Sequence, residues 1–159
     1  MEKITEDTRT PFPQADDFEK IVRIVNINKV EKLKDKMYLS ILLGNITERQ
    51  VMYYMSACVY LGLIDDDKNF TELGKELRSE NIVNQEVLFC HIITEKPVFR
   101  YIYFFEKYLG SELEKDEIIS LMKKFEIVFD SEEIYKRRSS TVRKWINWIK
   151  RCSINSSGN

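Results

Sequence analysis

The sequence predicts a mainly α-helical protein. It contains only 5 Gly and 3 Pro among 159 residues, whereas a fold built from many short strands needs turn residues at frequent intervals. Apolar residues also recur at helical spacing, as in the stripe formed by Phe18, Ile21, Val22 and Val25. We therefore expect amphipathic helices with little β-sheet.

The first half of the chain has the element order of a winged helix. A helix expected over residues 31–43 precedes a second helix that begins at Thr47, where Gln50 completes a capping box. Residues 63–71 are then expected to form a short β-hairpin around a polar turn. Helix, turn, helix and hairpin follow one another, so we predict a first winged-helix unit over residues 15–80.

The second half repeats this outline without a completed wing. Residues 82–109 are strongly apolar and are expected to lie in the interior. Helices predicted over residues 114–125 and 132–151 then correspond to the helix-turn-helix pair of the first half, as a repeat of architecture rather than of residues. We predict a second helix-turn-helix unit over residues 81–152, packed against the first because no Pro/Gly/Ser-rich linker separates them.

The remaining features indicate an ordinary intracellular chain. Residues 1–14 and 153–159 are expected to form a flexible arm and a flexible tail, and the acidic N-terminus does not resemble a signal peptide. No run approaches the roughly 18 apolar residues of a membrane span. The three cysteines, Cys58, Cys90 and Cys152, form no CxxC pair, so neither a disulfide framework nor a zinc site is expected. We predict a cytoplasmic protein without a membrane partner.

Charge is distributed unevenly along the chain. The net charge is only −1, yet the segment from Tyr135 to Arg151 holds seven basic residues and no acidic one. Such segregation indicates a basic face on an acidic body. Because duplex DNA carries dense phosphate charge, a helix of this kind is a candidate DNA-binding element. The candidate contacts on it are Lys136, Arg137, Arg138, Ser140, Arg143 and Lys144.

The basic helix has an alternative interpretation as a solvated face opposite Trp145 and Trp148. No acidic residue is interleaved to form i,i+4 ion pairs, and this favours DNA contact. Side chains near the helix start can meet base edges, while those further along meet phosphates. The hypothesis requires that the side chains of Arg137, Arg138, Arg143 and Lys144 project together into solvent.

The first recognition helix offers a second set of DNA contacts. Arg49, Gln50 and Tyr53 occupy its exposed N-terminal positions, and Arg and Gln suit guanine and adenine edges respectively. Gln50 is also the expected capping partner of Thr47, which weighs against a base contact. The acidic turn at residues 65–67 argues against a wing that grips phosphate.

Nothing in the sequence indicates an enzyme. The only histidine, His91, lies in an apolar stretch and is expected to be a hydrogen-bonded core residue. No set of carboxylates is placed by a nuclease motif, and there is no glycine-rich phosphate loop. We predict no catalytic residue, no metal and no cofactor.

Two sets of motifs resemble the tandem winged-helix modules of bacterial restriction-modification systems. The first set is ITERQVxYY at residues 46–54, YLGL at 60–63 and FTELG at 70–74; the second is RRSSTV at 137–142 and WIxWI at 145–149. The likeness extends over roughly residues 15–150, apart from the missing second wing. In that family such modules read DNA beside a nuclease domain or occur alone. The resemblance implies a duplex DNA-binding module with a nuclease or methyltransferase as candidate partner.

A second hypothesis comes from a different class of function. Winged-helix units also serve as docking surfaces, so the chain could be a protein-interaction adaptor or a transcriptional regulator. The aromatic residues Tyr53, Tyr60, Tyr101 and Tyr108 suit such a role. Binding to random duplex DNA at low salt separates the two hypotheses, because only the first requires it.

Overall fold

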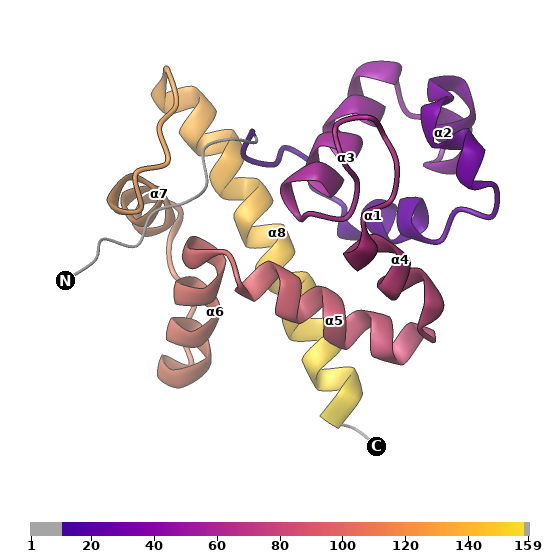
Figure 1. Ribbon diagram of the computed structural model, residues 1–159. Coiled ribbons are helices and arrows are strands. Elements are labelled where there is room, and N and C mark those ends of the chain that lie inside the picture. Colours follow the sequence, from indigo (N-terminus) through magenta and orange to yellow (C-terminus); the bar gives the residue numbers. More distant parts are fainter. Residues whose placement is uncertain (1–10, 158–159) are drawn as a thin grey trace.

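The computed structural model describes residues 11–157, and the side chains of residues 11–153. This part of the chain holds eight α-helices and one 3₁₀ helix, which confirms the prediction of a mainly α-helical protein (Figure 1). The elements are α1 Phe18–Val25, η1 Val30–Lys34, α2 Lys36–Leu42, α3 Glu48–Tyr60, α4 Glu72–Ser79, α5 Ile82–Thr94, α6 Pro97–Leu109, α7 Lys115–Lys124 and α8 Glu132–Ser157.

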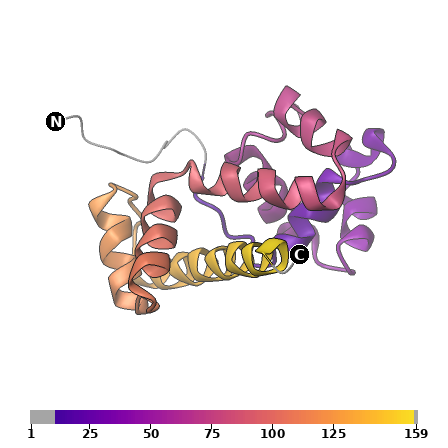
Figure 2. The ribbon, with the colours of Figure 1, turned by 90° about the horizontal axis from the view of Figure 1, so that it is seen from below.

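Helix α8 crosses the whole molecule. In Figure 1, helices α1 to α4 lie on one side of it and helices α6 and α7 on the other, while α5 runs across it. The view from below in Figure 2 shows the same separation. Elements from both halves of the sequence, α1, α5, α6 and α7, contact α8. The last helix is therefore the common support of the two halves.

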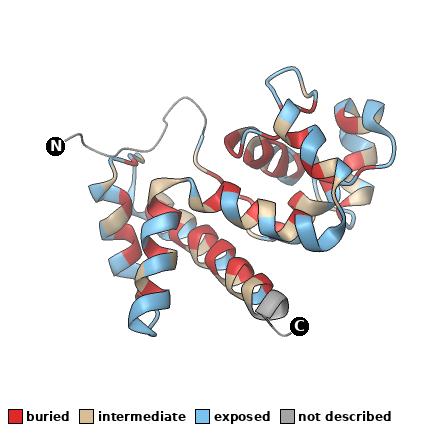
Figure 3. Ribbon diagram, turned by 60° about the horizontal axis from the view of Figure 1, so that its bottom comes forward, coloured by how far each residue is buried: buried red, intermediate tan, exposed pale blue. Residues whose placement is uncertain are grey.

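One apolar core joins the two halves. Trp145 of α8 is fully buried at its centre, with its ring 5.1 Å from that of Phe18 and 5.3 Å from that of Phe99. Figure 3 shows that the buried residues of α8 line the side that faces its neighbours. Large aromatic rings dominate this contact, and each contributes more burial than any aliphatic side chain.

The helix starts follow local capping chemistry. The Thr47 hydroxyl accepts from the amide of Gln50 at 3.1 Å, and the Gln50 side chain accepts from the amide of Thr47 at 3.0 Å, so the predicted capping box is confirmed. The single helix predicted over residues 31–43 is wrong in one respect. Asp35 accepts from the amide of Tyr38 and restarts the helix, which divides the segment into η1 and α2.

The predicted β-hairpin is reduced to a single bridge between Ile64 and Phe70, and the described residues contain no extended strand. The Asp65 carboxylate accepts from the amides of Asp67 and Asn69, so these groups do not extend a ladder. Thr71 follows the bridge directly and caps α4. The loop has no room for longer strands because a helix begins where the second strand would continue.

The N-terminal strap, residues 11–17, corrects the expectation of a flexible arm through residue 14. The Phe12 ring lies 5.7 Å from that of Tyr60 and 5.9 Å from that of Phe99, so it contacts both halves of the chain. The carbonyl of Ala15 accepts from the indole nitrogen of Trp145 at 2.7 Å. Residues 1–10 of the expected arm lie outside the described residues.

The C-terminal end also differs from expectation. Helix α8 continues to Ser157, whereas a flexible tail was predicted from residue 153.

Among the described helices, none is both long enough and apolar enough to cross a membrane.

Candidate nucleic-acid interface

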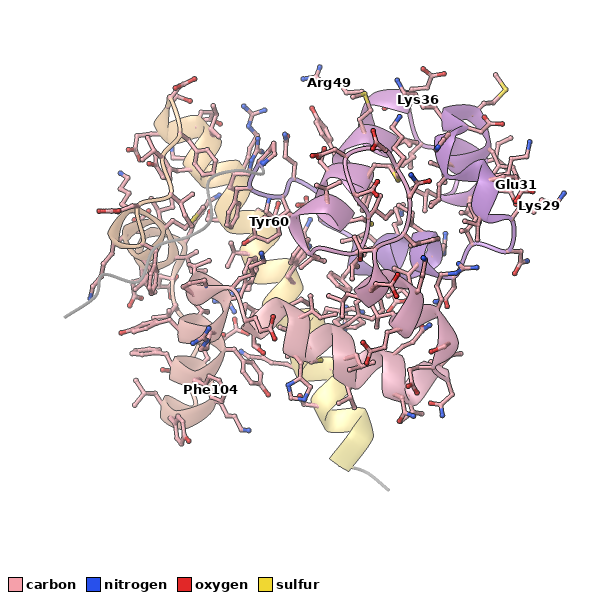
Figure 4. All side chains as sticks on the ribbon, in the orientation of Figure 1. Lys29, Glu31, Lys36, Arg49, Tyr60 and Phe104 are labelled. Carbon is pink, nitrogen blue, oxygen red and sulfur yellow. The ribbon has the colours of Figure 1, made fainter. Side chains whose placement is uncertain are left out.

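The exposed start of α3 carries the first group of predicted contacts. Arg49 is exposed (Figure 4). Its Nε donates to the hydroxyl of Tyr53 at 2.7 Å, and the guanidinium lies 5.8 Å from the centre of that ring. This contact between residues four apart on one helix orients the arginine before any ligand arrives. The side-chain oxygen of Gln50 is held in the capping box, as its sequence position predicted. Arg49 and Tyr53 are therefore the available pair on this helix.

The start of α8 carries the second group. Lys136 and Arg137 are exposed, and neither forms an ion pair with any residue that the structure describes. Arg138 is half-buried, with its guanidinium 5.6 Å from the centre of the Phe129 ring. Ser140 is half-buried as well. The second turn of α8 therefore presents positive charge, while the first turn carries Glu132, which pairs with Lys123, and Glu133.

Arg138 lies where the two groups meet. Burial lowers its pKa, and the adjacent charge of Arg137 lowers it further, while Tyr53 of α3 and Asp16 of the strap are close enough to oppose that shift. Tyr53 is itself the partner of Arg49. The starts of α3 and α8 thus lie close enough for Tyr53 to act on the charge of Arg138, and we refer to the basic residues there and Tyr53 together as the seam. It comprises Arg49, Tyr53, Lys136, Arg137 and Arg138.

Arg143 contradicts the sequence-based expectation. Its two terminal nitrogens donate to the carboxylate of Glu106 at 2.8 and 2.7 Å, and one of them also donates to the carbonyl of Leu113. Lys150 donates to the same carboxylate at 2.6 Å. Glu106 is only 3% exposed. Arg143 is therefore part of an internal ion-pair network and does not project into solvent, so the four side chains do not project together as the DNA-binding hypothesis required.

The pKa of Glu106 reflects this network. Burial alone would raise it, but hydrogen bonds from Arg143, Lys150 and the amide of Leu113 lower the pKa to about 2. The carboxylate is consequently charged at any physiological pH. It fixes α6, the loop after α6 and α8 relative to one another.

Lys144 has an intermediate position. Its ammonium group lies 3.2 Å from the Asp16 carboxylate, and the two side chains are 53% and 43% exposed. Asp16 also accepts from the hydroxyl of Thr141. The strap therefore partly neutralises Lys144 but leaves it open to solvent. Arg143, in contrast, is bound to the buried carboxylate of Glu106.

Sequence reasoning missed Glu106 and Asp16 as the partners of these cations. One signal for Glu106 exists in the sequence, because it continues the four-residue spacing of Val98 and Ile102, both of which are buried. A charged residue in an apolar helical stripe needs a buried partner. No comparable signal marks Asp16, whose contacts depend on the path of the strap.

Two other expectations need correction. His91 was expected in the core, but it is exposed on α5, because that helix turns Phe89 and Ile92 inward instead. Tyr60 is buried against Phe12 and is not available as a docking residue, whereas Tyr101 and Tyr108 are exposed.

The three cysteines are free thiols. Burial raises the pKa of Cys58 to about 12. No group of three or more His, Cys, Asp or Glu residues within the described part of the chain is arranged to hold a metal ion.

Comparison with known proteins gives a single assignment. No curated protein and no solved structure shows significant similarity to this chain. One family model, described as a domain of unknown function (DUF7226), matches residues 18–153 and so covers α1 to α8 except the last residues of α8. The chain therefore belongs to the DUF7226 family.

Proposed function

We propose that this protein binds duplex DNA through the seam between α3 and α8. The observation that carries the proposal is the gathering of cations from two helices on one surface, where Arg49, Arg137 and Arg138 have no acidic ion-pair partner among the described residues. Further along α8, Glu106 pairs with Arg143 and Lys150, and Asp16 pairs with Lys144. A group of cations without acidic partners is suited to a polyanion.

The local architecture supports the same proposal. Helices α2 and α3 are joined through Gly44 and Asn45, both with positive φ, as in a tight turn between the helices of a helix-turn-helix unit. Residues 15–80 then form a winged-helix unit whose wing is one β-bridge. Helices α7 and α8 repeat the pair around Glu126, which also has positive φ. In this arrangement α3 and α8 are the two recognition helices.

The roles of the seam residues follow from their chemistry. Arg49, oriented by Tyr53, is placed to contact a base edge in the major groove if α3 enters it by its N-terminus. Lys136 and Arg137 extend into solvent and suit backbone phosphates. The acidic turn at residues 65–67 would be repelled by phosphate and is expected to face away from the duplex. The resemblance of the motifs in α3 and α8 to restriction-modification modules suggests a nuclease or methyltransferase as partner.

The test is a titration of a labelled random 30-base-pair duplex, about three helical turns long, over a range of salt concentrations. We expect binding that weakens steeply with salt, because each phosphate contact releases counterions. The double variant Lys136→Glu/Arg137→Glu should lose about 100-fold in affinity at low salt. A matched control, Lys29→Glu/Lys115→Glu, changes the net charge equally at exposed positions outside the seam and should lose little.

The second candidate function, a protein-interaction adaptor, is favoured by one specific observation. Helix α6 exposes large apolar side chains on one side, and clustered exposure of this kind marks interaction surfaces. These are Tyr101, Phe104, Tyr108 and Leu109, which are 42%, 41%, 82% and 62% exposed. If the wild-type protein does not bind duplex DNA even at low salt, the DNA proposal fails and the adaptor function replaces it.

A further inference from the structure

Arg138 is unusual among the basic residues of α8. Its Nε atom is buried and has no hydrogen-bond partner, and no other buried side-chain nitrogen or oxygen in the described residues is left in that state. Arg143 and Lys150, by comparison, share the buried carboxylate of Glu106. A buried donor without an acceptor is uncommon in native proteins and calls for an explanation.

The surroundings of Arg138 offer no acceptor of their own. Its guanidinium lies over the face of Phe129, a contact that attracts the cation but leaves the N–H groups unsatisfied. Asp16, the nearest acid, is already bound to Thr141 and Lys144. Arg137 adds a second positive charge beside it. The site therefore combines two cations and one orphaned donor, and the one acid that acts on Arg138 is bonded to other residues.

Such a residue weakens the folded state. An arginine that is partly removed from water, repelled by a neighbour and left without an acceptor costs more than an apolar side chain of similar length. Places where a sequence breaks a local rule without compensation in the fold are typically functional. The compensation for Arg138 is then expected from a ligand.

We propose that Arg138 is an anion-binding residue at the seam, and that its ligand is a phosphate group of a nucleic acid backbone. The inference rests on the proposed DNA-binding function and assigns one contact within it. A guanidinium presents Nε and a terminal nitrogen as a fork that matches two phosphate oxygens, which an ammonium group cannot do. A rotation of the side chain away from Phe129 releases Nε toward the ligand. Arg49, bonded to the hydroxyl of Tyr53, keeps its proposed contact with a base edge.

The first experiment measures stability without DNA. Arg138→Met keeps the apolar stem and removes the orphaned donor, so its Tm should equal or exceed that of the wild type by about 2 °C. Inorganic phosphate, compared with chloride at equal ionic strength, should raise the Tm of the wild type and leave that of Arg138→Met unchanged. A lower Tm for Arg138→Met together with an unchanged response to phosphate would show a structural role and overturn the inference.

The second experiment measures DNA affinity with charge-conserving variants. Arg138→Lys should weaken duplex binding about 10-fold, because the fork is lost, while Arg137→Lys should weaken it only about 2-fold. Equal losses for the two variants would remove the special role of Arg138. If the wild type responds to phosphate through Arg138 but does not bind DNA, the proposed function fails and the anion site loses its assignment to nucleic acid.

Discussion

Helix α8 carries basic side chains both before Arg143 and from Arg143 onward, and these two parts, called here its first and second halves, use them differently. Arg143 and Lys150 converge on the buried carboxylate of Glu106, at distances of 2.7 and 2.6 Å. Lys136 and Arg137, about two turns before Arg143, have no ion-pair partner among the described residues. The same residue types therefore hold the fold together in one half and present charge to solvent in the other.

The difference lies in what packs against each half. The second half faces α6, whose Glu106 stands in an otherwise apolar stripe with Val98 and Ile102. A carboxylate in that position is tolerated only if cations and hydrogen bonds satisfy it. The first half lies beside Phe129, which supplies a ring, and the one acid of the strap that acts on it, Asp16, is bonded to Thr141 and Lys144. Residue type alone does not distinguish structural from binding arginines, since the neighbouring element decides between them.

The largest effect is expected from breaking the paired half. Glu106→Leu removes the carboxylate and leaves Arg143 and Lys150 without their shared partner. The free energy of unfolding should fall by about 3–5 kcal/mol, the usual cost of stranding one member of a buried ion pair. Urea denaturation monitored by circular dichroism measures this quantity directly.

A double substitution provides the control for that experiment. Glu106→Leu combined with Arg143→Met replaces charges by apolar groups of similar size, and most of the lost stability should return. Lys150 keeps Glu112, 3.8 Å away, as an exposed partner. If the double variant is no more stable than Glu106→Leu, the loss comes from packing rather than from unpaired charge.

Acid should weaken the same half without any substitution. The pKa of Glu106 is about 2 in the folded protein, below its ordinary value of 4.5, so the unfolded chain takes up the proton first as the pH falls. The stabilisation is complete above about pH 4.5 and is lost between there and pH 2. The fall in unfolding free energy over this window should be smaller in Glu106→Leu than in the wild type. Equal slopes in the two proteins would exclude Glu106 as the titrating group.

The first half of α8, whose cations are unpaired, is held in place by aromatic packing. Substitution of Phe12 tests this. This ring contacts Tyr60, Phe99 and Phe129, and Phe129 supports Arg138. Phe12→Ala should cost about 2–3 kcal/mol, somewhat less than a fully buried phenylalanine. Phe104→Ala, at an exposed ring of α6, should cost less than about 1 kcal/mol. Similar losses for both would mean that the strap does not hold the seam.

Much of the fold was predictable because its signals are local. The capping box at Thr47 depends on residues three positions apart, and both of its hydrogen bonds are present. The predictions that were wrong concern competition between local signals. Asp35 starts a new helix inside a continuous apolar pattern, and Thr71 starts α4 where a strand of the hairpin was expected. Each of these caps accepts a hydrogen bond from a backbone amide in the first turn of its helix. A longer preceding helix or strand would lose that hydrogen bond.

The candidate site was less predictable because its decisive partners are remote in the sequence. The absence of acids within the basic segment correctly excludes i,i+4 pairs, but Glu106 is 37 residues from Arg143 and Asp16 is 128 from Lys144. Periodicity gives the face of a helix and not the element that covers it. The cations of α8 could therefore be identified from the sequence, and their division into two groups could not.

Lys144 lies between the structural and the binding cations of α8, and its substitution tests to which group it belongs. This substitution has the smallest expected effect on stability. Its pair with Asp16 is about half exposed on both sides, so Lys144→Ala should change the unfolding free energy by less than about 0.5 kcal/mol. If Lys144 belongs to the binding group, as its exposure favours, this variant should weaken DNA binding about 3–10-fold and lower the salt slope by about one counterion.

Asp16→Asn supplies the opposite change, since it keeps an acceptor for Thr141 and releases Lys144. That variant should bind DNA more tightly, because a negative charge beside the seam has been removed. If the two substitutions change DNA affinity in opposite directions and leave the unfolding free energy almost constant, Lys144 belongs to the same binding group as Arg137. A loss of stability above about 1 kcal/mol with an unchanged salt slope would instead place it with Arg143.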